Sequence, residues 1–230
     1  MNLILVGIEY SGTTTLADAI TDWFMDETGL NIGPHDHFKL PHFVHEPLTD
    51  EEQRLVLALS PQVLEQLQRH QIEYHLQDGF FESGDANTCG FYIEDAVYGP
   101  LYWGYGGPGE LGDRTLYSRH CEDVILEYEP ETVLILLTAT PEVIAKRMKE
   151  SPHSSSPLKE EDIELVLRRF QQEFDTSRIR NKITLDTSMV AVEETLTEFV
   201  AEVDPFLTDA DRNRMRYHRR LHHGTAEMLR

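Results

Sequence analysis

The sequence has few cysteines, few basic residues and no long apolar run, and each shortage excludes a class of protein. Among its 230 residues, Cys89 and Cys121 are the only cysteines, which excludes a disulfide-stapled fold and a zinc site built on CxxC pairs. Twenty basic residues face 41 acidic ones, and the net charge of −21 argues against a protein that coats nucleic acid or an anionic membrane. The first apolar run, residues 3–6, is too short for a signal-peptide core or a membrane span, so we expect a cytoplasmic protein.

Strand and helix patterns alternate along the chain. Four short apolar runs have the length of strands buried on both faces: residues 2–6, 89–93, 132–137 and 182–185. Capping signals and helical spacing predict helices after the first run, from Thr49, from Ser60, over 140–148, over 163–174 and over 192–203. Residues 31–48 and 98–112 are expected to be loops. This order predicts an α/β fold with a parallel sheet flanked by helices on both faces.

The last 26 residues differ from the rest in charge. Residues 205–230 carry six arginines against three acidic residues, a net charge of +3, whereas the preceding body carries −24. We interpret this tail as a terminal helix capped at Thr208 that docks on the body or on a neighbouring subunit of a homodimer.

A glycine loop follows the first predicted strand and precedes a helix. The spacing Gly7-x4-Gly12-Thr13-Thr14 has the layout of a phosphate-binding loop, in which backbone N–H groups and a helix N-terminus hold phosphate oxygens. Thr14 stands where such loops place a hydroxyl ligand for Mg²⁺, and Thr13 stands where they place a lysine. The residues expected to bind the phosphates are Gly7, Ser11, Gly12, Thr13, Thr14 and Thr15.

These features resemble the thymidylate kinase and deoxynucleoside kinase group of nucleoside and nucleotide kinases, over roughly residues 1–204. Residues 7–15 are similar to that group's Gly-x-Asp/Glu-Gly-Ser-Gly-Lys-Thr-Thr loop, and His45-Glu46-Pro47 resembles the Glu-Pro after its second strand. Residues 92–98 look like its Glu-Arg-Ser or Asp-Arg-Tyr segment. The resemblance implies a three-layer P-loop NTPase fold over residues 1–204, with residues 205–230 as a helical extension.

The resemblance also implies an activity and roles for individual residues. The chain would bind ATP or another nucleoside triphosphate with Mg²⁺ and transfer a phosphoryl group to a small acceptor. Glu46 or Glu94 would receive the acceptor's proton, Thr14 and Asp95 would hold Mg²⁺, and Arg147 would neutralise charge from the lid. The residues expected to contact the acceptor are Asp36, His37, Arg69 and Tyr98.

Two departures from the group's pattern leave alternatives open. Thr13 replaces the loop lysine and Asp95 stands where the group has arginine, so two cations that would meet phosphate are missing. The lid cations Lys146, Arg147, Lys149 and Lys159 would then compensate, or the chain is a nucleotide-binding pseudokinase. The segment Ser11-Gly-Thr-Thr14 also resembles the phosphosulfate-binding loop of sulfotransferases, although Tyr10 stands where that family has lysine or arginine.

Two further clusters each allow a functional and a structural interpretation. The histidines at positions 35, 37, 42 and 45 form either a metal site or an ordinary polar loop. The aromatic residues of the glycine-rich run 98–112 either stack on a planar ligand or pin the loop to the body.

Overall fold

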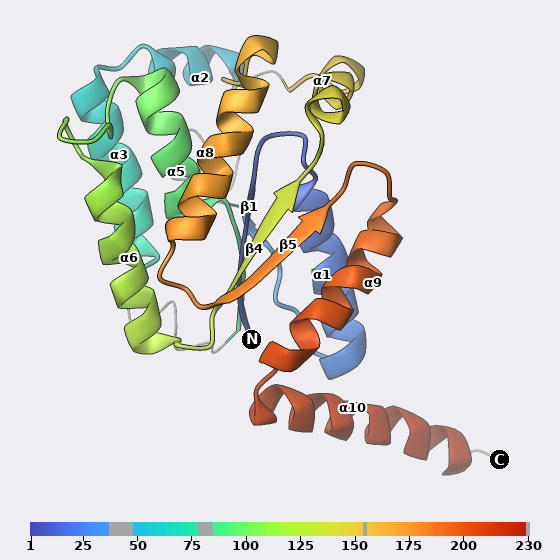
Figure 1. Cartoon of the computed structure of the whole chain (residues 1–230). Coiled ribbons are helices and arrows are strands. Elements are labelled where there is room, and N and C mark those ends of the chain that lie inside the picture. The colour runs from blue at the N-terminus through green and yellow to red at the C-terminus, as the bar shows by residue number, and fades with distance from the viewer. Residues whose placement is uncertain (37–47, 78–84, 154–155, 229–230) are drawn as a thin grey trace.

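The computed structural model describes residues 1–36, 48–77, 85–153 and 156–228, and it shows one parallel sheet at the centre of the chain. The five strands are β1 (Asn2–Gly7), β2 (His35–Asp36), β3 (Ala86–Cys89), β4 (Val133–Thr138) and β5 (Asn181–Asp186). Their order across the sheet is β2-β3-β1-β4-β5 and every neighbouring pair is parallel, as the arrows of β4 and β5 show in Figure 1. The predicted α/β class with a parallel sheet is confirmed.

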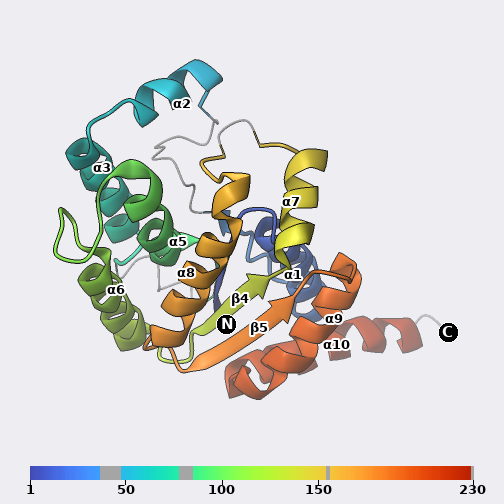
Figure 2. The same cartoon turned by 45° about the horizontal axis from the view of Figure 1, so that its top comes forward.

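Helices cover both faces of this sheet. On one face lie α1 (Thr13–Thr28) and α9 (Val192–Val203), and on the other lie α5 (Phe91–Tyr98), α6 (Arg114–Tyr128) and α8 (Ile163–Thr176), as both views show (Figures 1 and 2). Side chains of β1 alternate between the two layers: Leu3 and Leu5 join the apolar cluster of α1 and α9, whereas Ile4 and Val6 join the cluster of α5 and α8. This alternation makes three layers with two apolar interiors.

The remaining elements surround the edges of the sheet. They are α2 (Asp50–Leu57), α3 (Pro61–Tyr74), the π-helix η1 (Gly99–Trp103), α7 (Pro141–Glu150), the 3₁₀ turns η2 (Glu160–Asp162) and η3 (Asp204–Phe206), and α10 (Asp209–Met228). Within the described ranges, no helix combines the length and the apolar character that crossing a bilayer requires.

The capping residues predicted from the sequence lie at the starts of the expected helices. Thr49 and Glu52 form a reciprocal capping box at the start of α2. The Thr140 hydroxyl accepts the N–H of Val143 at the start of α7, at 3.4 Å. The Thr208 hydroxyl accepts the N–H of Asp211 at 3.1 Å, which confirms the predicted cap of the terminal helix.

Three local predictions were wrong. The strand predicted over 89–93 ends at Cys89, because Gly90 turns the chain at a φ of +74° and α5 begins at Phe91. The loop predicted over 98–112 begins instead with the end of α5 and the π-helix η1. Residues 35–36, placed in a loop, form the short edge strand β2, and α6 lies in a stretch for which the sequence suggested no element.

The tail docks on the body of its own chain. Helix α10 packs against α1, where Arg219 lies 2.5 Å from Glu27, and its Arg214 guanidinium lies 2.5 Å from the carboxylate of Asp85, the residue before β3. Met215 of α10 is buried, and the helix runs along the lower edge of the body in Figure 1. The predicted terminal helix is therefore confirmed, whereas its standing as a domain separate from residues 1–204 stays a prediction.

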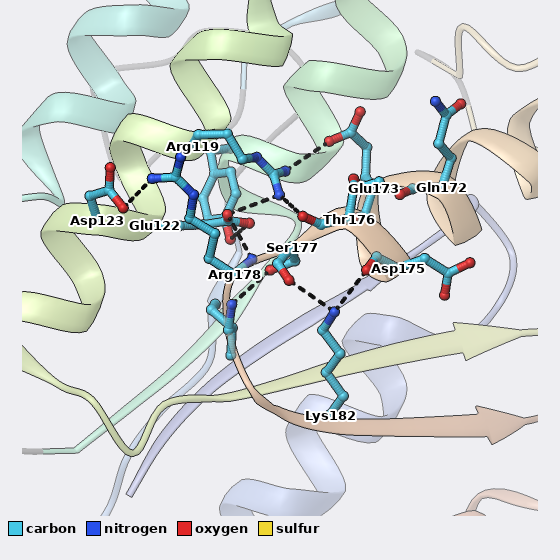
Figure 3. A network of polar contacts seen from close by, with 12 residues as sticks. Arg119, Glu122, Asp123, Gln172, Glu173, Asp175, Thr176, Ser177, Arg178 and Lys182 are labelled. Atoms are coloured by element: carbon cyan, nitrogen blue, oxygen red, sulfur yellow. Dashed lines mark hydrogen bonds and ion pairs between the residues drawn. The ribbon is translucent and has the colours of Figure 1, made fainter.

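A buried carboxylate on α6 holds the segment that connects the end of α8 to the start of β5. The Glu122 side chain is fully buried, accepts the Tyr92 hydroxyl at 3.1 Å and the N–H of Arg178 at 3.0 Å, and pairs with Arg119 at 3.0 Å. Arg119 also reaches Glu173 at the end of α8 (Figure 3). Burying a charge is costly unless it is paired and hydrogen-bonded, and Glu122 has partners on its own helix, on α5 and in the segment after α8.

Replacing Glu122 by alanine should therefore destabilise the fold far more than the same change at its neighbour Asp123. The Glu122→Ala change leaves Arg119 and Tyr92 without their buried partner, for an expected loss of about 3–5 kcal/mol in the free energy of unfolding. The Asp123 side chain is 60% exposed and pairs with an exposed arginine, so Asp123→Ala should change stability little. Urea unfolding followed by circular dichroism measures both, and equal losses would contradict this account of the network.

Candidate functional site

The glycine loop, residues 7–15, leaves the carboxyl end of β1 and becomes the first turn of α1. A side chain at Gly7 would put its Cβ 2.5 Å from the carbonyl oxygen of Leu137, so this position requires glycine by close approach. Gly12 is the N-cap of α1 with a φ of +95°, a left-handed conformation that favours glycine. A Cβ at Gly12 would meet no atom within 4 Å, which shows that the loop opens outward there.

The loop presents hydrogen-bond donors to this open side. Gly12 caps α1 without a side chain, and the first helical hydrogen bond runs from the N–H of Leu16 to the Gly12 carbonyl. The N–H groups of Thr13, Thr14 and Thr15 precede that bond and have no partner in the described part of the chain. The Ser11 hydroxyl is likewise buried without a partner there. A row of donors at a positive helix end is an anion-binding arrangement.

Thr14 faces a carboxylate from the edge of the sheet. Its hydroxyl donates to Asp36 at 3.3 Å, and Asp36 ends β2. The structure thus brings together two residues that the sequence assigned to different roles, Thr14 to a metal and Asp36 to the acceptor. A hydroxyl and a carboxylate are oxygen ligands of the kind that Mg²⁺ prefers.

Glu94 lies near the same end of the sheet. Burial and then the charges of Asp36 and Glu94 raise the pKa of the Cys89 thiol, which closes β3. Gly90 makes room for this carboxylate, since a Cβ there would lie 1.9 Å from a Glu94 oxygen. Thr14, Asp36 and Glu94 therefore gather at the carboxyl ends of β1, β2 and β3, where open α/β sheets bind ligands.

Arg147 of α7 clamps the backbone of the glycine loop. Its guanidinium donates to the carbonyl of Tyr10 at 2.9 Å, to the Thr187 hydroxyl at 3.0 Å and to the Thr187 carbonyl at 2.6 Å. The Thr187 hydroxyl donates in turn to the carbonyl of Ser11 at 2.9 Å. The predicted lid cation thus lies beside the loop, and Thr187, which sequence reasoning missed, joins it from the end of β5.

Tyr10 connects the loop to the segment after α7. It is one of two non-glycine residues with positive φ in the described chain, at +68°. Its ring stacks on the ring of His153 with centroids 4.4 Å apart, and its hydroxyl accepts the N–H of His153 at 3.2 Å. Beside it, the Ser156 hydroxyl donates to the Glu9 carboxylate. In the sequence, Tyr10 stands out only as a departure from the sulfotransferase motif, because its partner His153 lies 143 positions away.

Together these parts enclose one cleft, which we call the loop cleft. Its volume is about 620 Å³, within the range of small-ligand sites. Its walls come from the glycine loop, from α7 and the residues after it, and from the segment between β5 and α9. The lining residues are Glu9, Tyr10, Ser11, Gly12, Thr13, Thr14, Thr15, Leu16, Arg147, Glu150, Ser151, His153, Thr187, Val190, Val192 and Thr195.

Asp95 and Arg69 belong to a second, buried network behind the site. The carboxylate of Asp95 accepts Arg114 at 2.5 Å and the Tyr105 hydroxyl at 2.7 Å. Arg114 also donates to Glu65 at 2.8 Å, and Glu65 accepts Arg69 at 2.6 Å and 2.8 Å. The structure thus pairs Asp95 with a cation of α6 instead of placing it at Thr14, and it pairs Arg69 with a carboxylate of its own helix.

This network lowers the pKa of the Glu65 carboxylate. Burial acts to raise the pKa of Glu65, but the hydrogen bonds and charges of Arg114 and Arg69 outweigh burial and leave the pKa below its ordinary value. Arg114 is 1% exposed and lies over the ring of Tyr117. Glu65 and Arg114 were both missed in the sequence, where nothing marks a buried ion pair between residues 49 positions apart.

Tyr98 is a core residue and not an open stacking surface. Its side chain is completely buried, with its ring against Tyr102 and Phe170. Its hydroxyl accepts the N–H of Glu9 at 3.2 Å, so it supports the glycine loop from behind. This placement corrects the predicted acceptor contact and favours the structural interpretation of the aromatic run.

Two predicted site residues, His37 and Glu46, lie outside the described residues, as do His42 and His45. Of the proposed histidine cluster the structure describes His35 alone, whose ring lies 4.2 Å from that of His75. In the described ranges, no group of three histidine, cysteine or acidic side chains is arranged to hold a metal ion.

Solved structures identify the fold, whereas no family model and no curated protein sequence matches the chain. Deoxyadenosine kinase from M. mycoides with bound dATP is 12% identical, with a TM-score of 0.54 over 89% of this chain and 100% of that one. Thymidylate kinase from Candida albicans is 13% identical, with a TM-score of 0.55 over 89% and 91%. The Bacillus subtilis protein YorR, solved with phosphorylated GDP, is 16% identical, with a TM-score of 0.55 over 90% and 99%. The chain therefore has the P-loop fold of nucleoside and nucleotide kinases, as predicted.

Removing the guanidinium of Arg114 should destabilise this fold strongly. Arg114→Met leaves Asp95 and Glu65 as buried carboxylates without their shared cation, for an expected loss of about 3–5 kcal/mol at pH 7. Because the folded pKa of Glu65 is lowered, the stabilisation that Glu65 gives the parent protein is present above pH 4.5 and is lost as the pH falls through the lowered value. The gap between variant and parent should therefore shrink on acidification, which urea unfolding at several pH values measures.

The matched control is Arg69→Met, which removes a cation that is 33% exposed from the same Glu65 carboxylate. It should cost much less than Arg114→Met. Equal costs, or a gap that does not depend on pH, would contradict the role given to the buried network.

Proposed function

We propose that the chain binds a nucleoside triphosphate in the loop cleft and transfers its terminal phosphoryl group to a small acceptor. The observation that carries this proposal is the row of N–H groups at Thr13, Thr14 and Thr15, which have no partner among the described residues and line a cleft of about 620 Å³. Solved proteins of this fold include kinases with bound dATP and dCTP, which supports nucleotide as the ligand class. The net charge and the absence of a basic surface cluster at the cleft in the described chain favour a small molecule over nucleic acid.

Mg²⁺ fits the residues at the mouth of the glycine loop. We assign its protein ligands to the Thr14 hydroxyl and to Asp36, because these side chains already meet at 3.3 Å. Asp95, the carboxylate expected from the sequence, is engaged by Arg114 and Tyr105. Mg²⁺ typically takes one or two carboxylates together with substrate phosphates and water, and when bound it neutralises charge on the phosphates.

The transfer step requires a base for the acceptor. The acceptor oxygen forms the new bond to the terminal phosphorus, the bond from that phosphorus to the bridging oxygen breaks, and the nucleoside diphosphate leaves. The acceptor's proton passes to a carboxylate, for which we propose Glu94 in the described chain or Glu46 outside it. Glu94 lies at the carboxyl ends of the strands, where, in addition to burial, the charges of Asp36 and Glu94 lie close enough to Cys89 to raise the pKa of its thiol.

A second candidate function is nucleotide binding without phosphoryl transfer, and the positively charged residues at the glycine loop favour it. Thr13 replaces the lysine of the loop, and Arg147 donates three hydrogen bonds to protein groups. Phosphoryl transfer depends on neutralising the charge of the phosphates, so a cleft whose described lining has only Arg147 and His153 as possible cations suits a binding module.

Binding should depend on the open space at Gly12. Gly12→Ala puts a methyl group on the outward side of the loop and should weaken ATP–Mg²⁺ binding at least tenfold in isothermal titration. Gly109→Ala is the matched control, since Gly109 also has positive φ, at +73°, and also has no atom within 4 Å of its Cβ position. Both variants should lose about 1 kcal/mol of stability from backbone strain, but Gly109→Ala should bind like the parent. Equal ATP–Mg²⁺ affinity of the parent, Gly12→Ala and Gly109→Ala would contradict the assignment of the nucleotide site to the glycine loop.

Transfer should be detected with radiolabelled ATP against a panel of nucleosides and nucleotides. We expect a labelled product with the parent and a loss of at least tenfold in rate with Thr14→Val, which removes the hydroxyl beside Asp36. Thr115→Val is the control, because Thr115 is an exposed threonine at the same place in the first turn of α6 and lies outside the lining of the cleft. Binding with no product for any acceptor would leave the nucleotide-binding candidate.

Sulfotransfer can be distinguished from phosphoryl transfer by which nucleotide the protein binds more tightly. A larger rise in melting temperature with adenosine 3′,5′-bisphosphate than with ADP would favour it over phosphoryl transfer.

A further inference from the structure

The loop cleft has two described lining residues that can carry positive charge, Arg147 and His153. The sequence places threonine at position 13, where such loops hold a lysine, so the source of positive charge at the phosphates must lie elsewhere. Arg147 always carries its charge, but its guanidinium is hydrogen-bonded to the carbonyls of Tyr10 and Thr187 and to the Thr187 hydroxyl. It serves first to hold the loop and β5 together.

His153 is fixed in place by the glycine loop itself. Its ring stacks on Tyr10 with centroids 4.4 Å apart and an angle of 27° between the planes, and its backbone N–H donates to the Tyr10 hydroxyl at 3.2 Å. The side chain is exposed and lines the cleft together with Thr13. No hydrogen bond within the described chain uses its ring nitrogens, so both are available to donate to an anion.

The charged groups that line the loop cleft around His153 come from two elements, the glycine loop and α7. Glu9 of the glycine loop is buried and accepts the hydroxyl of Ser156. Glu150 of α7 lines the cleft and lies 3.8 Å from Lys146, and Arg147 lies on the same helix. The described segment between β5 and α9 contributes threonine and valine to the lining and no charge. A histidine facing carboxylates and phosphates gains favourable interactions when it is protonated.

We propose that His153, as an imidazolium, supplies the cation that the glycine loop lacks and binds the phosphates at the open end of the loop. Tyr10 is its positioning residue, because the stack and the hydrogen bond from the His153 backbone hold the ring over the loop. This inference rests on the proposed function, since it needs a polyphosphate in the loop cleft. Its consequence is that affinity rises as the pH falls through the range where histidine gains a proton.

The test measures binding of inorganic tripolyphosphate by isothermal titration at pH 6.0 and pH 8.0 at constant ionic strength, with parent and His153→Gln. Protonation of the ligand affects both proteins alike, so the ratio of their dissociation constants isolates the histidine. We expect about a tenfold weaker binding by His153→Gln at pH 6.0, the loss of one charge-assisted hydrogen bond, and less than a twofold difference at pH 8.0. His153→Lys should bind more tightly than the parent at pH 8.0, because its charge persists there.

A matched control and a spectroscopic readout exclude a merely structural effect. His120→Gln removes another exposed histidine, on α6 and outside the lining of the cleft, and should leave both dissociation constants unchanged. In NMR spectra of the parent, the titration of the His153 ring should move to higher pH when tripolyphosphate is added. Equal binding by parent and His153→Gln at both pH values, with no movement of the titration, overturns the inference while leaving the phosphate site in place. A parent that binds no tripolyphosphate at either pH overturns the proposed function as well.

Discussion

The candidate site depends on how the glycine loop satisfies its own backbone. A tight loop between β1 and α1 points some N–H groups outward, and its carbonyls must then find donors elsewhere. The Tyr10 carbonyl is bonded by Arg147 and the Ser11 carbonyl by Thr187, so α7 and the end of β5 are attached to the loop through two main-chain oxygens. The walls of the loop cleft are the same elements. Satisfying the carbonyls therefore builds the cleft that the unpartnered N–H groups face.

The same constraint explains why Arg147 cannot be counted simply as a substitute for a loop lysine. An arginine that bonds three oxygens of the protein still contributes positive charge nearby, but three of its five N–H donors hold the protein's own backbone and Thr187. Asp95 is a similar case, because it stands where the kinase group that the sequence resembles has an arginine. Here Arg114 of α6 places a guanidinium against the Asp95 carboxylate, and the charges of Asp95 and Glu65 compensate it. Positive charge is thus present near both sites but is used to hold the protein together.

The sequence was informative where structure follows from neighbouring residues and uninformative where it follows from distant ones. The strand β1, the glycine loop, and the helix caps at Thr49, Thr140 and Thr208 are local features, and each was predicted. Helix α5 was missed because it is buried nearly all round, so its apolar residues show no helical period and resemble a strand.

Long-range pairs had no signal in the sequence at all. Arg114 meets Glu65 across 49 positions, Arg147 meets Tyr10 across 137, and no spacing rule connects such residues. Asp36 was named as a site residue from its place near the second strand, but its contact with Thr14 requires the parallel order of β2, β3 and β1. The types of site residue were thus predictable from one sequence, whereas their pairing needed the fold.

Tyr10 shows how one substitution can change the chemistry of a loop of this kind. Left-handed backbone costs a tyrosine about 1–2 kcal/mol relative to glycine, so a position with a φ of +68° ordinarily favours glycine. The cost is offset by what the side chain reaches, since the ring stacks on His153 and the hydroxyl accepts its N–H. A glycine at this position would leave the loop intact but would give the segment after α7 no ring to rest on. The loop thus has a tyrosine where a glycine would fit more easily, and a threonine where a lysine is usual. The two features complement each other, because Tyr10 positions the imidazole ring of His153 beside the turn that lacks a lysine ammonium group.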